Sequence, residues 1–318
     1  MKMILLGFKP DVLTEAQVAQ VRAAAPEMRV VLSHEREEIE RVLGEVEIIA
    51  GNVPRDLLVK ATKLRWYQQW GAGADWLLRH PEAAELDFVL TNASGVHSVP
   101  ISEHILATLL AFARQLPQAV RLQARREWRS QREVFELAGK TMLLIGVGRI
   151  GERTALVAEA LGMRVLGVRR DATKGVAAIE AMYGPEQLLE LLPQADVVVV
   201  TVPLTKETSG MIGEKELEVM KASAYLVNIG RGGTVQEAAL VRALQEGWIA
   251  GAGLDVFATE PLPEDSPLWL MENVIVTAHY SGSTPHYNDR VLAIFLGNLE
   301  RYHKGEPLHN VVDKQVGY

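Results

Sequence analysis

A short apolar run that ends in a glycine-rich turn constrains this sequence more than any other feature. Residues 141–151 read TMLLIGVGRIG, and the segment that follows has apolar residues at helical spacing. Strand, tight glycine turn and helix in this order form the G-x-G-x-x-G arrangement that holds a dinucleotide. The three glycines allow a sharp turn, close approach to a pyrophosphate and tight helix packing. We expect the phosphates at the helix N-terminus, bound by Gly146, Gly148, Arg149, Ile150 and Gly151.

The composition excludes several classes of protein. The chain has 318 residues and no cysteine, which excludes disulfides, thiolate metal sites and a cysteine nucleophile. Its formal net charge of −7 gives no general attraction for nucleic acid or anionic lipid. No apolar stretch approaches the ~18 residues that span a membrane, and the apolar run at residues 3–8 is too short for a signal peptide. We therefore expect a soluble cytoplasmic protein, and no cluster with metal-ligand spacing indicates a metal site.

The first ninety residues alternate short apolar runs with amphipathic segments. Strands are expected at 3–8, 28–33, 46–51, 64–70 and 88–94, and helices at 14–25 and 36–45. This βαβ rhythm predicts a parallel sheet with helices on its faces. After the fourth strand comes a loop of small residues whose N–H groups could hold a carboxylate, although spacing alone favours a plain turn: Gly71, Ala72 and Gly73.

The longest helical stretch, residues 99–128, lies between two halves rich in βα units, as a domain crossover would. Pro100 suits its first turn, and Pro117 is expected to break or kink it. The end of this stretch is basic, with Arg121, Arg125, Arg126, Arg129 and Arg132. Such a face can bind an anion or a partner, but a solvated or subunit-facing helix side is the commoner case.

The strand after the glycine turn, residues 163–168, is followed by Arg169 and Arg170. The residue that closes this strand meets the adenosine ribose. A carboxylate there binds the 2′-hydroxyl of NAD, whereas arginine suits the additional phosphate of NADP. Asp171 comes two residues late and carries less weight. We expect NADP(H) to be favoured and keep NAD as the alternative, because two arginines at a strand end can also be ordinary surface charge.

Four further apolar runs predict strands buried on both faces of a parallel sheet, at residues 195–205, 224–233, 250–257 and 273–282. In open α/β sheets the carboxyl ends of the strands line the ligand crevice. Residues far apart in sequence therefore converge at one edge of the sheet: Arg231, Asp255, Glu260 and His279.

His279 is the best acid–base candidate among the eight histidines. It follows a buried strand, and Glu260 follows the neighbouring one; a histidine beside a carboxylate can deliver a proton near neutrality. Arg231 lies among glycines, and its guanidinium can hold a substrate carboxylate through two parallel hydrogen bonds. Together with the dinucleotide turn, these residues describe hydride transfer to a 2-oxo acid. Other histidines have the features of ordinary surface or core residues: His34, His80 and His104.

The chain resembles the D-isomer-specific 2-hydroxyacid dehydrogenase family, in its glyoxylate/hydroxypyruvate reductase-like branch. Five segments carry the resemblance, in the family's order and spacing: GVGRIG, TVPLTKET, LVNIGRGG, GAGLDVFATEPLP and VTAHYSG. The resemblance covers essentially the whole chain. It implies two α/β domains, Rossmann-like or flavodoxin-like, each with a doubly wound parallel sheet. The dinucleotide-binding domain, residues 99–284, would be inserted into a substrate domain formed by residues 1–98 and 285–318.

The family's functional residues carry over to matching positions. Arg231 would orient the substrate, His279 would be the acid–base group and Glu260 its partner, while Asp255 would hold the nicotinamide carboxamide. The loop Gly71–Gly73 matches the one that receives the substrate carboxylate, which reverses the preference from spacing alone. Further cofactor contacts are expected at Val202, Pro203 and Thr208. The resemblance also implies a homodimer formed through the cofactor domain, in which the basic helix end takes part.

The chain departs from the family pattern at Ala278, where most members have proline before the catalytic histidine. Glu260 argues against the formate dehydrogenase branch, in which glutamine takes this place. The resemblance implies an NAD(P)-dependent oxidoreductase that interconverts a 2-oxo acid and a D-2-hydroxy acid, with glyoxylate and hydroxypyruvate as guesses by analogy. Two alternatives stay open: a non-catalytic corepressor that senses the dinucleotide, and an enzyme that oxidises an inorganic anion such as phosphite.

Overall fold

A computed structural model describes residues 2–130 and 133–315, so Arg132 of the expected basic helix end lies outside the described residues. The chain divides into two compact units, one formed by residues 1–96 and 284–318 and the other by residues 97–283. In sequence, the second unit is therefore inserted between two segments of the first.

The first unit is built on five parallel strands in the order β2-β1-β3-β4-β5. Their bounds are Met3–Gly7 (β1), Arg29–Leu32 (β2), Ile48–Gly51 (β3), Trp66–Gln69 (β4) and Val89–Thr91 (β5). Successive side chains point to opposite faces of the sheet, so each strand supplies two cores. Leu5 and Tyr67 are fully buried in one core, and Ile4 and Trp66 are fully buried in the other.

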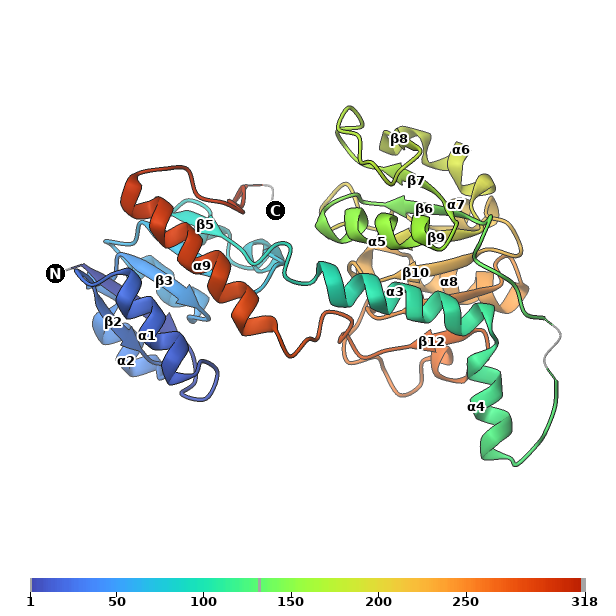
Figure 1. The fold of residues 1–318 in the computed structure, drawn as a ribbon, viewed down its shortest axis with the longest axis horizontal. Helices are drawn as coiled ribbons and strands as arrows, with labels where there is room; N and C mark the ends of the chain where they lie inside the picture. The colour runs from blue at the N-terminus through green and yellow to red at the C-terminus, as the bar shows by residue number, and fades with distance from the viewer. Residues whose placement is uncertain (1, 131–132, 316–318) are drawn as a thin grey trace. The chain divides into compact units, whose positions relative to one another are not determined.

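Helices cover both faces of this sheet. Helix α1 (Glu15–Ala24) begins at a capping box and lies beside the C-terminal helix α9 (Tyr287–Lys304), as Figure 1 shows. Both helices pack on the core that contains Ile4, to which α9 contributes Phe295. The opposite face is covered by α2 (Arg36–Val42) and by short 3₁₀ helices at Leu43–Glu45, Arg55–Lys60, Asp75–Leu78 and Pro81–Ala83.

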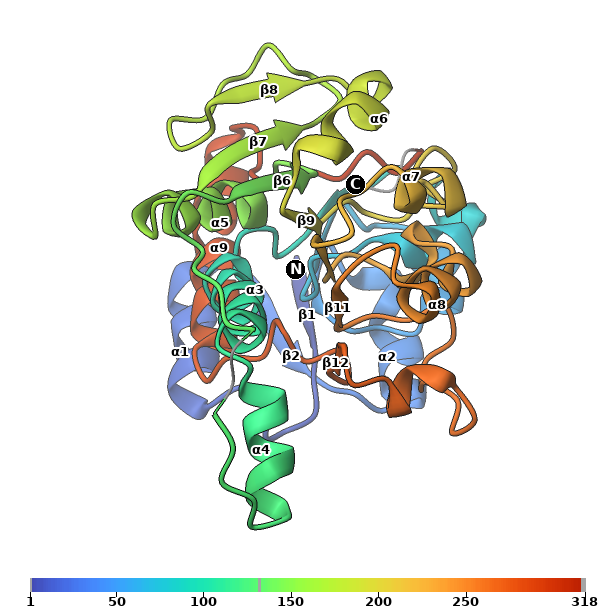
Figure 2. The same cartoon turned by 90° about the vertical axis from the view of Figure 1, so that its right-hand side faces the viewer.

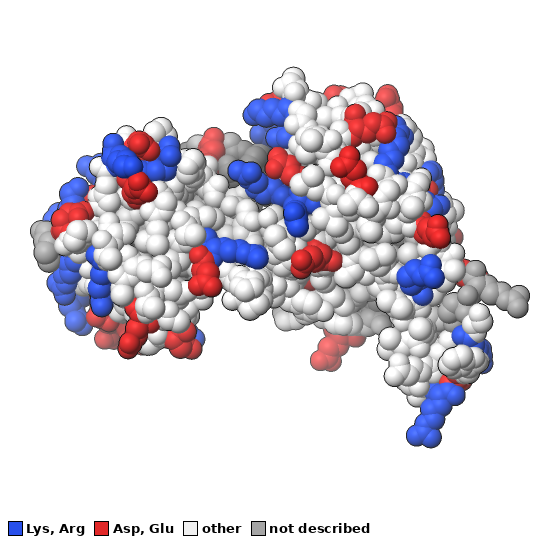
Figure 3. All heavy atoms as spheres, viewed as in Figure 1, with Lys and Arg blue, Asp and Glu red and all other residues white. Residues whose placement is uncertain are grey.

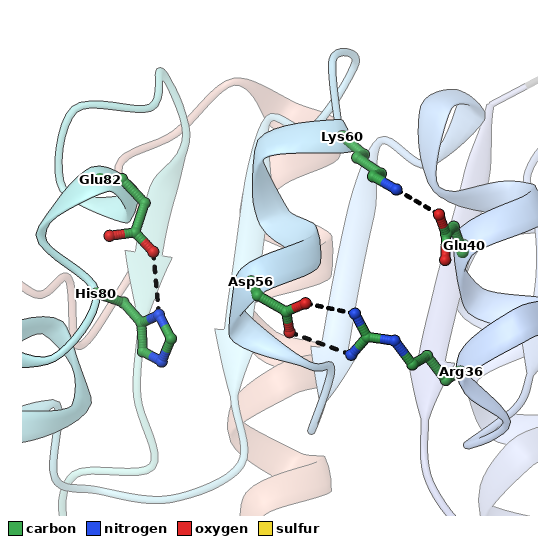
Figure 4. A network of polar contacts seen from close by, with 6 residues as sticks. All are labelled: Arg36, Glu40, Asp56, Lys60, His80 and Glu82. Carbon is green, nitrogen blue, oxygen red and sulfur yellow. Dashed lines mark hydrogen bonds and ion pairs between the residues drawn. The ribbon is translucent and has the colours of Figure 1, made fainter.

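Exposed ion pairs join α2 to the 3₁₀ helix Arg55–Lys60 (Figure 4). Arg36 donates to both carboxylate oxygens of Asp56, and Lys60 pairs with Glu40. The hydrogen bond from Arg36 lowers the pKa of Asp56, and the hydrogen bond from Lys60 lowers the pKa of Glu40. Because water screens these side chains, the pairs contribute little to stability at neutral pH.

The second unit is built on seven parallel strands in the order β12-β11-β10-β9-β6-β7-β8. Their bounds are Thr141–Ile145 (β6), Arg164–Val168 (β7), Ala181–Tyr183 (β8), Val197–Val200 (β9), Tyr225–Asn228 (β10), Gly251–Leu254 (β11) and Val274–Val276 (β12). From β6 the chain first builds the sheet toward β8 and then returns to β9 on the other side of β6. The strand order therefore reverses between β6 and β9, the place where open α/β sheets bind ligands.

Two layers of helices enclose this second sheet. Helices α3 (Ser98–Ala113) and α5 (Arg149–Ala160) cover one face, while α6 (Leu188–Leu191), α7 (Glu214–Glu218) and α8 (Glu237–Glu246) cover the other (Figure 2). The neighbouring residues Leu143 and Leu144 of β6 enter opposite cores, as expected for a strand buried on both faces. Short 3₁₀ helices lie at Pro185–Gln187, Leu192–Gln194, Gly232–Thr234 and Pro267–Leu270.

The helical stretch expected at residues 99–128 consists of two helices. Helix α3 ends at Ala113, and α4 runs from Leu116 to Ala124. Between them Gln115 has a φ of +55°, in the left-handed region, so the chain turns before Pro117. Pro117 then lies in the first turn of α4, where its missing N–H group costs no hydrogen bond. Helix α4 extends away from the rest of its unit (Figure 1).

The expected fold class, two α/β domains with parallel sheets, is confirmed. One strand was missed: β8 has three partly exposed residues at the sheet edge and therefore no apolar run that marks it in the sequence. Among the described residues, no helix has both the length and the apolar character needed to cross a membrane.

Candidate active site

Two glycines of the turn between β6 and α5 are required by the packing of the protein itself. Gly146 has a φ of +96°, and a Cβ atom there would lie 2.8 Å from Val202 Cγ1. A Cβ atom on Gly151 would lie 2.6 Å from the carbonyl oxygen of Gly146. A larger residue at either position would push the helix off the turn.

Gly148 has free space around its Cα atom, in contrast to Gly146 and Gly151. A Cβ atom at this position would meet no atom within 4 Å. Gly148 is also the N-cap of α5, and no side chain caps this helix end. The first N–H groups of α5 are therefore left for a ligand, and the open position gives a pyrophosphate room to approach. These features fit a dinucleotide.

The segment after β9 lies against the glycine turn. Thr201 Oγ1 donates a hydrogen bond of 2.6 Å to the carbonyl oxygen of Gly146, and Val202 packs beside it. Thr208 Oγ1 donates to Pro203 O at 2.6 Å, which closes the loop that follows. The two loops at the switch point are thus fixed to one another.

Arg169 and Arg170 follow the end of β7. The backbone N–H of Arg169 donates to Tyr183 O of β8 at 3.0 Å, which anchors this corner of the sheet. The Asp171 carboxylate lies 3.2 Å from the backbone N of Thr173 and 3.3 Å from Lys174 Nζ, so it is engaged within its own loop. The charged residues that directly follow the end of β7 are therefore the two arginines, Arg169 and Arg170.

Arg231 follows β10 and lies between two glycines that the packing requires. A Cβ atom on Gly230 would lie 2.6 Å from Val202 O, and one on Gly232 would lie 1.9 Å from the carbonyl carbon of Phe257. Arg231 Nη1 donates to Gly230 O at 2.8 Å, and the side chain is partly buried. These contacts hold the guanidinium near the carboxyl edge of the sheet.

His279 and Glu260 form a hydrogen-bonded pair beyond the ends of β12 and β11. His279 Nδ1 lies 2.7 Å from Glu260 Oε2, and Glu260 Oε1 accepts a hydrogen bond of 3.0 Å from the backbone N of Phe257. The carboxylate thus orients the ring through Nδ1 and leaves Nε2 for a ligand. The imidazole is 49% exposed, so a substrate can reach it. The pair can transfer a proton.

Asp255 fixes the loop that carries His279. The residue is 1% exposed, and its two carboxylate oxygens accept from Tyr280 N at 3.1 Å and Ser281 N at 3.0 Å. Its carbonyl oxygen accepts from His279 N at 2.9 Å. His279 has a φ of +53°, so these contacts hold a side-chain-bearing residue in the left-handed region. The expected contact of Asp255 with nicotinamide stays a prediction.

Thr277 and His104 extend this network, in which the sequence indicated no part for Thr277 and predicted that His104 is an ordinary surface or core residue. Thr277 Oγ1 donates to Asp255 Oδ1 at 2.6 Å and lies 3.2 Å from His104 Nε2. Because the single hydroxyl proton goes to Asp255, the hydroxyl accepts from His104, whose Nε2 then carries a hydrogen. His104 lies on α3, so no local pattern connects it to a loop that begins after β12.

The structure gathers most of the expected site residues at the carboxyl edge of the second sheet. The exception is the loop Gly71–Gly73, which follows β4 in the first unit. Its three residues are partly or fully exposed. Within residues 2–130 and 133–315, no three His, Asp or Glu side chains group as metal ligands would.

Comparison with known proteins identifies the family. A family model described as "D-isomer specific 2-hydroxyacid dehydrogenase, NAD binding domain" matches residues 106–281, more than half of the chain. The chain belongs to this family. A glyoxylate reductase of Korarchaeum cryptofilum is 34% identical over 301 residues, which covers 92% of this chain and 88% of the relative.

Two solved structures extend this similarity to the whole 2-hydroxyacid dehydrogenase fold. A family member from Aeromonas salmonicida has a TM-score of 0.84 and 35% identity, over 98% of this chain and 99% of that one. An NADPH-dependent glyoxylate/hydroxypyruvate reductase of Sinorhizobium meliloti, in complex with NADP and sulfate, has a TM-score of 0.85 and 28% identity, over 100% and 99%. The protein is thus an NAD(P)-dependent oxidoreductase of the 2-hydroxyacid dehydrogenase family.

Proposed function

We propose that this dehydrogenase interconverts small 2-oxo acids and D-2-hydroxy acids, with NADPH as its preferred reductant. The observation that carries the proposal is the 2.7 Å contact between His279 Nδ1 and Glu260 Oε2. The pair belongs to the unit that holds the glycine turn and Arg231. An oriented imidazole, a cation and a dinucleotide turn on one sheet are the groups that carbonyl reduction needs.

In the proposed reaction each residue has one task. When bound, the nicotinamide supplies a hydride to the carbonyl carbon of the substrate. His279 gives the proton on Nε2 to the carbonyl oxygen, which becomes the hydroxyl group, while Glu260 stabilises the imidazolium before the transfer. Arg231 orients the 2-oxo acid and stabilises negative charge that develops on the carbonyl oxygen. In the reverse direction, neutral His279 accepts the hydroxyl proton.

The substrate acid group is proposed to bind the loop Gly71–Gly73 through backbone N–H groups. The relative from K. cryptofilum is named a glyoxylate reductase, and the S. meliloti protein is named a glyoxylate/hydroxypyruvate reductase. We therefore expect glyoxylate and hydroxypyruvate to be the first substrates to test, followed by bulkier 2-oxo acids.

Two arguments support a preference for NADPH. Arg169 and Arg170 follow β7, where the 2′-phosphate of NADP would lie, and the nearby Asp171 carboxylate is engaged within its own loop. Solved family members from S. meliloti and Xanthobacter autotrophicus hold NADP and NADPH, respectively. Replacement of both arginines by alanine should raise KM for NADPH ~10-fold or more and leave KM for NADH nearly unchanged.

A homodimer formed through the second unit is part of the proposal. Helix α4 extends from this unit, and its exposed side includes Leu116 and Val120; Trp128 beyond it is fully exposed. Figure 3 shows that the visible face of α4 is largely uncharged, with positive side chains near its end. Apolar side chains exposed in this way are typical of a surface that a second subunit covers.

The deciding measurement is the oxidation of NADPH and of NADH in the presence of a panel of 2-oxo acids. We expect turnover with both reductants and kcat/KM at least ~10-fold higher with NADPH. Preference for NADH would remove the role of Arg169 and Arg170 and leave the acid–base assignment intact. A protein that binds NADPH but reduces none of the acids would contradict the proposal and favour a dinucleotide sensor.

A further inference from the structure

Gln69 ties down the loop Gly71–Gly73 from inside the first unit. This residue ends β4 and is 2% exposed. Its Nε2 donates to Gly71 O at 3.0 Å and also to Gly73 O, while its Oε1 accepts from Trp76 Nε1 at 2.6 Å. An indole nitrogen can only donate, so the amide has one orientation, with its NH₂ group toward the two loop carbonyls.

Side chains from two other segments bind the carbonyls that Gln69 does not reach. Asn92, which directly follows β5, donates from Nδ2 to Ala72 O at 2.8 Å. Tyr287, the first residue of α9, donates its hydroxyl to Trp70 O at 2.6 Å. Four consecutive carbonyls, at residues 70–73, are therefore bound by side chains of the same unit.

The backbone N–H groups of this loop, in contrast to its carbonyls, are not bound by other groups of the protein that the structure describes. Among the groups that the structure describes, which do not include the Asp75 side chain, the amides of Gly71, Ala72 and Gly73 donate to no protein acceptor. The loop also carries no side chain larger than a methyl group, and all three residues reach the surface. A segment whose carbonyls are all held inward, and whose amides are unpaired and accessible, is complementary to an anion.

We propose that Gln69, assisted by Asn92 and Tyr287, is a positioning residue that keeps this loop ready for a carboxylate. This inference rests on the proposed function, because it assigns the loop to the acid group of a 2-oxo acid. If Gln69 is removed, Gly73 O loses its buried partner and must turn toward water, and Gly71 O keeps only the backbone N–H of Ala93 at 3.1 Å. A carbonyl oxygen turned toward the ligand repels a carboxylate, so the loop would have to be reordered at each binding event.

A matched pair of variants tests this role. Gln69→Leu removes the amide at nearly constant volume. Gln68→Leu removes the neighbouring amide of β4, which is equally buried but bonds Gln69 O, Thr91 and Asn298 instead of the loop carbonyls. Both variants lose a buried hydrogen-bond network, so differences in stability alone cannot separate them. The readouts are Kd for oxamate, an unreactive analogue of glyoxylate, on the NADPH-loaded protein, and KM and kcat for glyoxylate.

We expect Gln69→Leu to weaken oxamate binding and to raise KM for glyoxylate by ~10- to 100-fold, with kcat and KM for NADPH within about threefold of wild type. Gln68→Leu should keep the wild-type values. Equal behaviour of the two variants, or a wild-type protein that does not bind oxamate, overturns the inference. Oxamate binding that depends on Gln69, in a protein that turns over no 2-oxo acid, supports the inference and overturns the proposed function.

Tyr287→Phe keeps the test decisive if Gln69→Leu does not fold. Gln69, Asn92 and Tyr287, which bind the carbonyls of residues 70–73, form a carbonyl clamp. Tyr287→Phe removes one hydroxyl and leaves the ring in place, so the clamp loses only the bond to Trp70 O. We expect a smaller rise in KM for glyoxylate, ~2- to 10-fold, and a similar loss of oxamate affinity. Unchanged oxamate affinity in Tyr287→Phe would overturn the part of the inference that assigns Tyr287 to the clamp.

Discussion

His279 occupies a backbone conformation that few side chains adopt, and the protein uses four hydrogen bonds to keep it there. Asp255 binds the backbone N–H groups of His279, Tyr280 and Ser281, and Glu260 orients the ring. In the proposed reaction this ring transfers a proton. We expect His279→Gln, which keeps a polar side chain but cannot titrate, to lower kcat for glyoxylate reduction by ~10²- to 10⁴-fold.

Steady-state kinetics, with NADPH binding followed by fluorescence titration, checks this expectation. The affinity for NADPH should stay at the wild-type value, because the glycine turn is untouched. A variant that reduces glyoxylate at the wild-type rate would show that another group supplies the proton.

Arg55 is a charged side chain that is buried without a full set of hydrogen-bond partners in the described part of the chain. Burial lowers its pKa to about 10, and its Nη1 is a buried atom without a hydrogen-bond partner in the described part of the chain. The guanidinium lies 4.3 Å from the Trp76 ring centroid and 5.0 Å from that of Tyr67. Contacts with aromatic faces offset only part of the cost of burying a charge.

We expect Arg55→Met to raise the free energy of unfolding by ~1 kcal/mol at neutral pH, where the guanidinium is charged in both the folded and unfolded states. The folded-state pKa is lowered, so the cost is present below about pH 10 and decreases as the pH rises further. Urea denaturation of wild type and variant at one temperature measures the difference. A less stable Arg55→Met would mean that the aromatic contacts outweigh the desolvation.

At the scale of elements, α2 and the 3₁₀ helix Arg55–Lys60 are joined by groups that respond to acid. Asp56 and Glu40 have folded-state pKa values below the ordinary 3.8 and 4.5, respectively. Their pairing therefore stabilises the fold above these values and is lost as the pH falls through the lowered ones. We expect the double variant Asp56→Asn, Glu40→Gln to lose less Tm than wild type between about pH 7 and about pH 3.

Thermal unfolding at both pH values gives the comparison, and added salt should reduce the difference because the pairs are exposed. Glu37→Gln is the matched control, since Glu37 lies on α2 but takes part in neither pair. Equal acid sensitivity of the double variant and wild type would show that the pairs contribute nothing to the stability of this corner.

The elements themselves could be predicted because strands buried on both faces are continuous apolar runs. This applies to β9, β10 and β11, whereas β12 lies at the sheet edge, where two of its three residues are only partly buried, and is marked by its apolar sequence alone. The alternation of helices with strands predicted that the sheets are parallel. The other edge strand, β8, could not be found in this way, because its three partly buried residues lie between Glu180 and Gly184 and form no longer apolar run. The break near Pro117 was expected, but its position at Gln115 depends on a local left-handed conformation.

The candidate site could be predicted where it depends on strand ends, and not where it depends on side-chain contacts. Arg231, Glu260 and His279 follow strands of one parallel sheet, so their shared edge follows from the order of the strands. The partners of the loop at residues 70–73 come from three separate segments, and Tyr287 is 217 positions from Trp70. No spacing rule connects such residues, so only the folded chain shows them.

At the scale of the whole molecule, the exposed apolar side of α4 makes a prediction about assembly. We expect wild type to be a dimer in solution and Val120→Glu to be a monomer, because a carboxylate in an apolar interface loses its hydration. Light scattering coupled to size exclusion measures both masses. Val59→Glu is the control, since Val59 is similarly exposed on the first unit. A Val120→Glu variant that remains dimeric would place the contact elsewhere.

The helix α9 has a consequence for how the chain is made. It supplies Phe295 and Leu299 to the core that also contains Ile4 and Leu6. Synthesis produces β1 first and α9 near the end, whereas residues 97–283 form one uninterrupted unit. All residues of the second unit therefore leave the ribosome before α9, which the first unit needs to complete its core. We expect the second unit of the nascent chain to fold first. The first unit, which contains β1, can fold only after α9 has been synthesised.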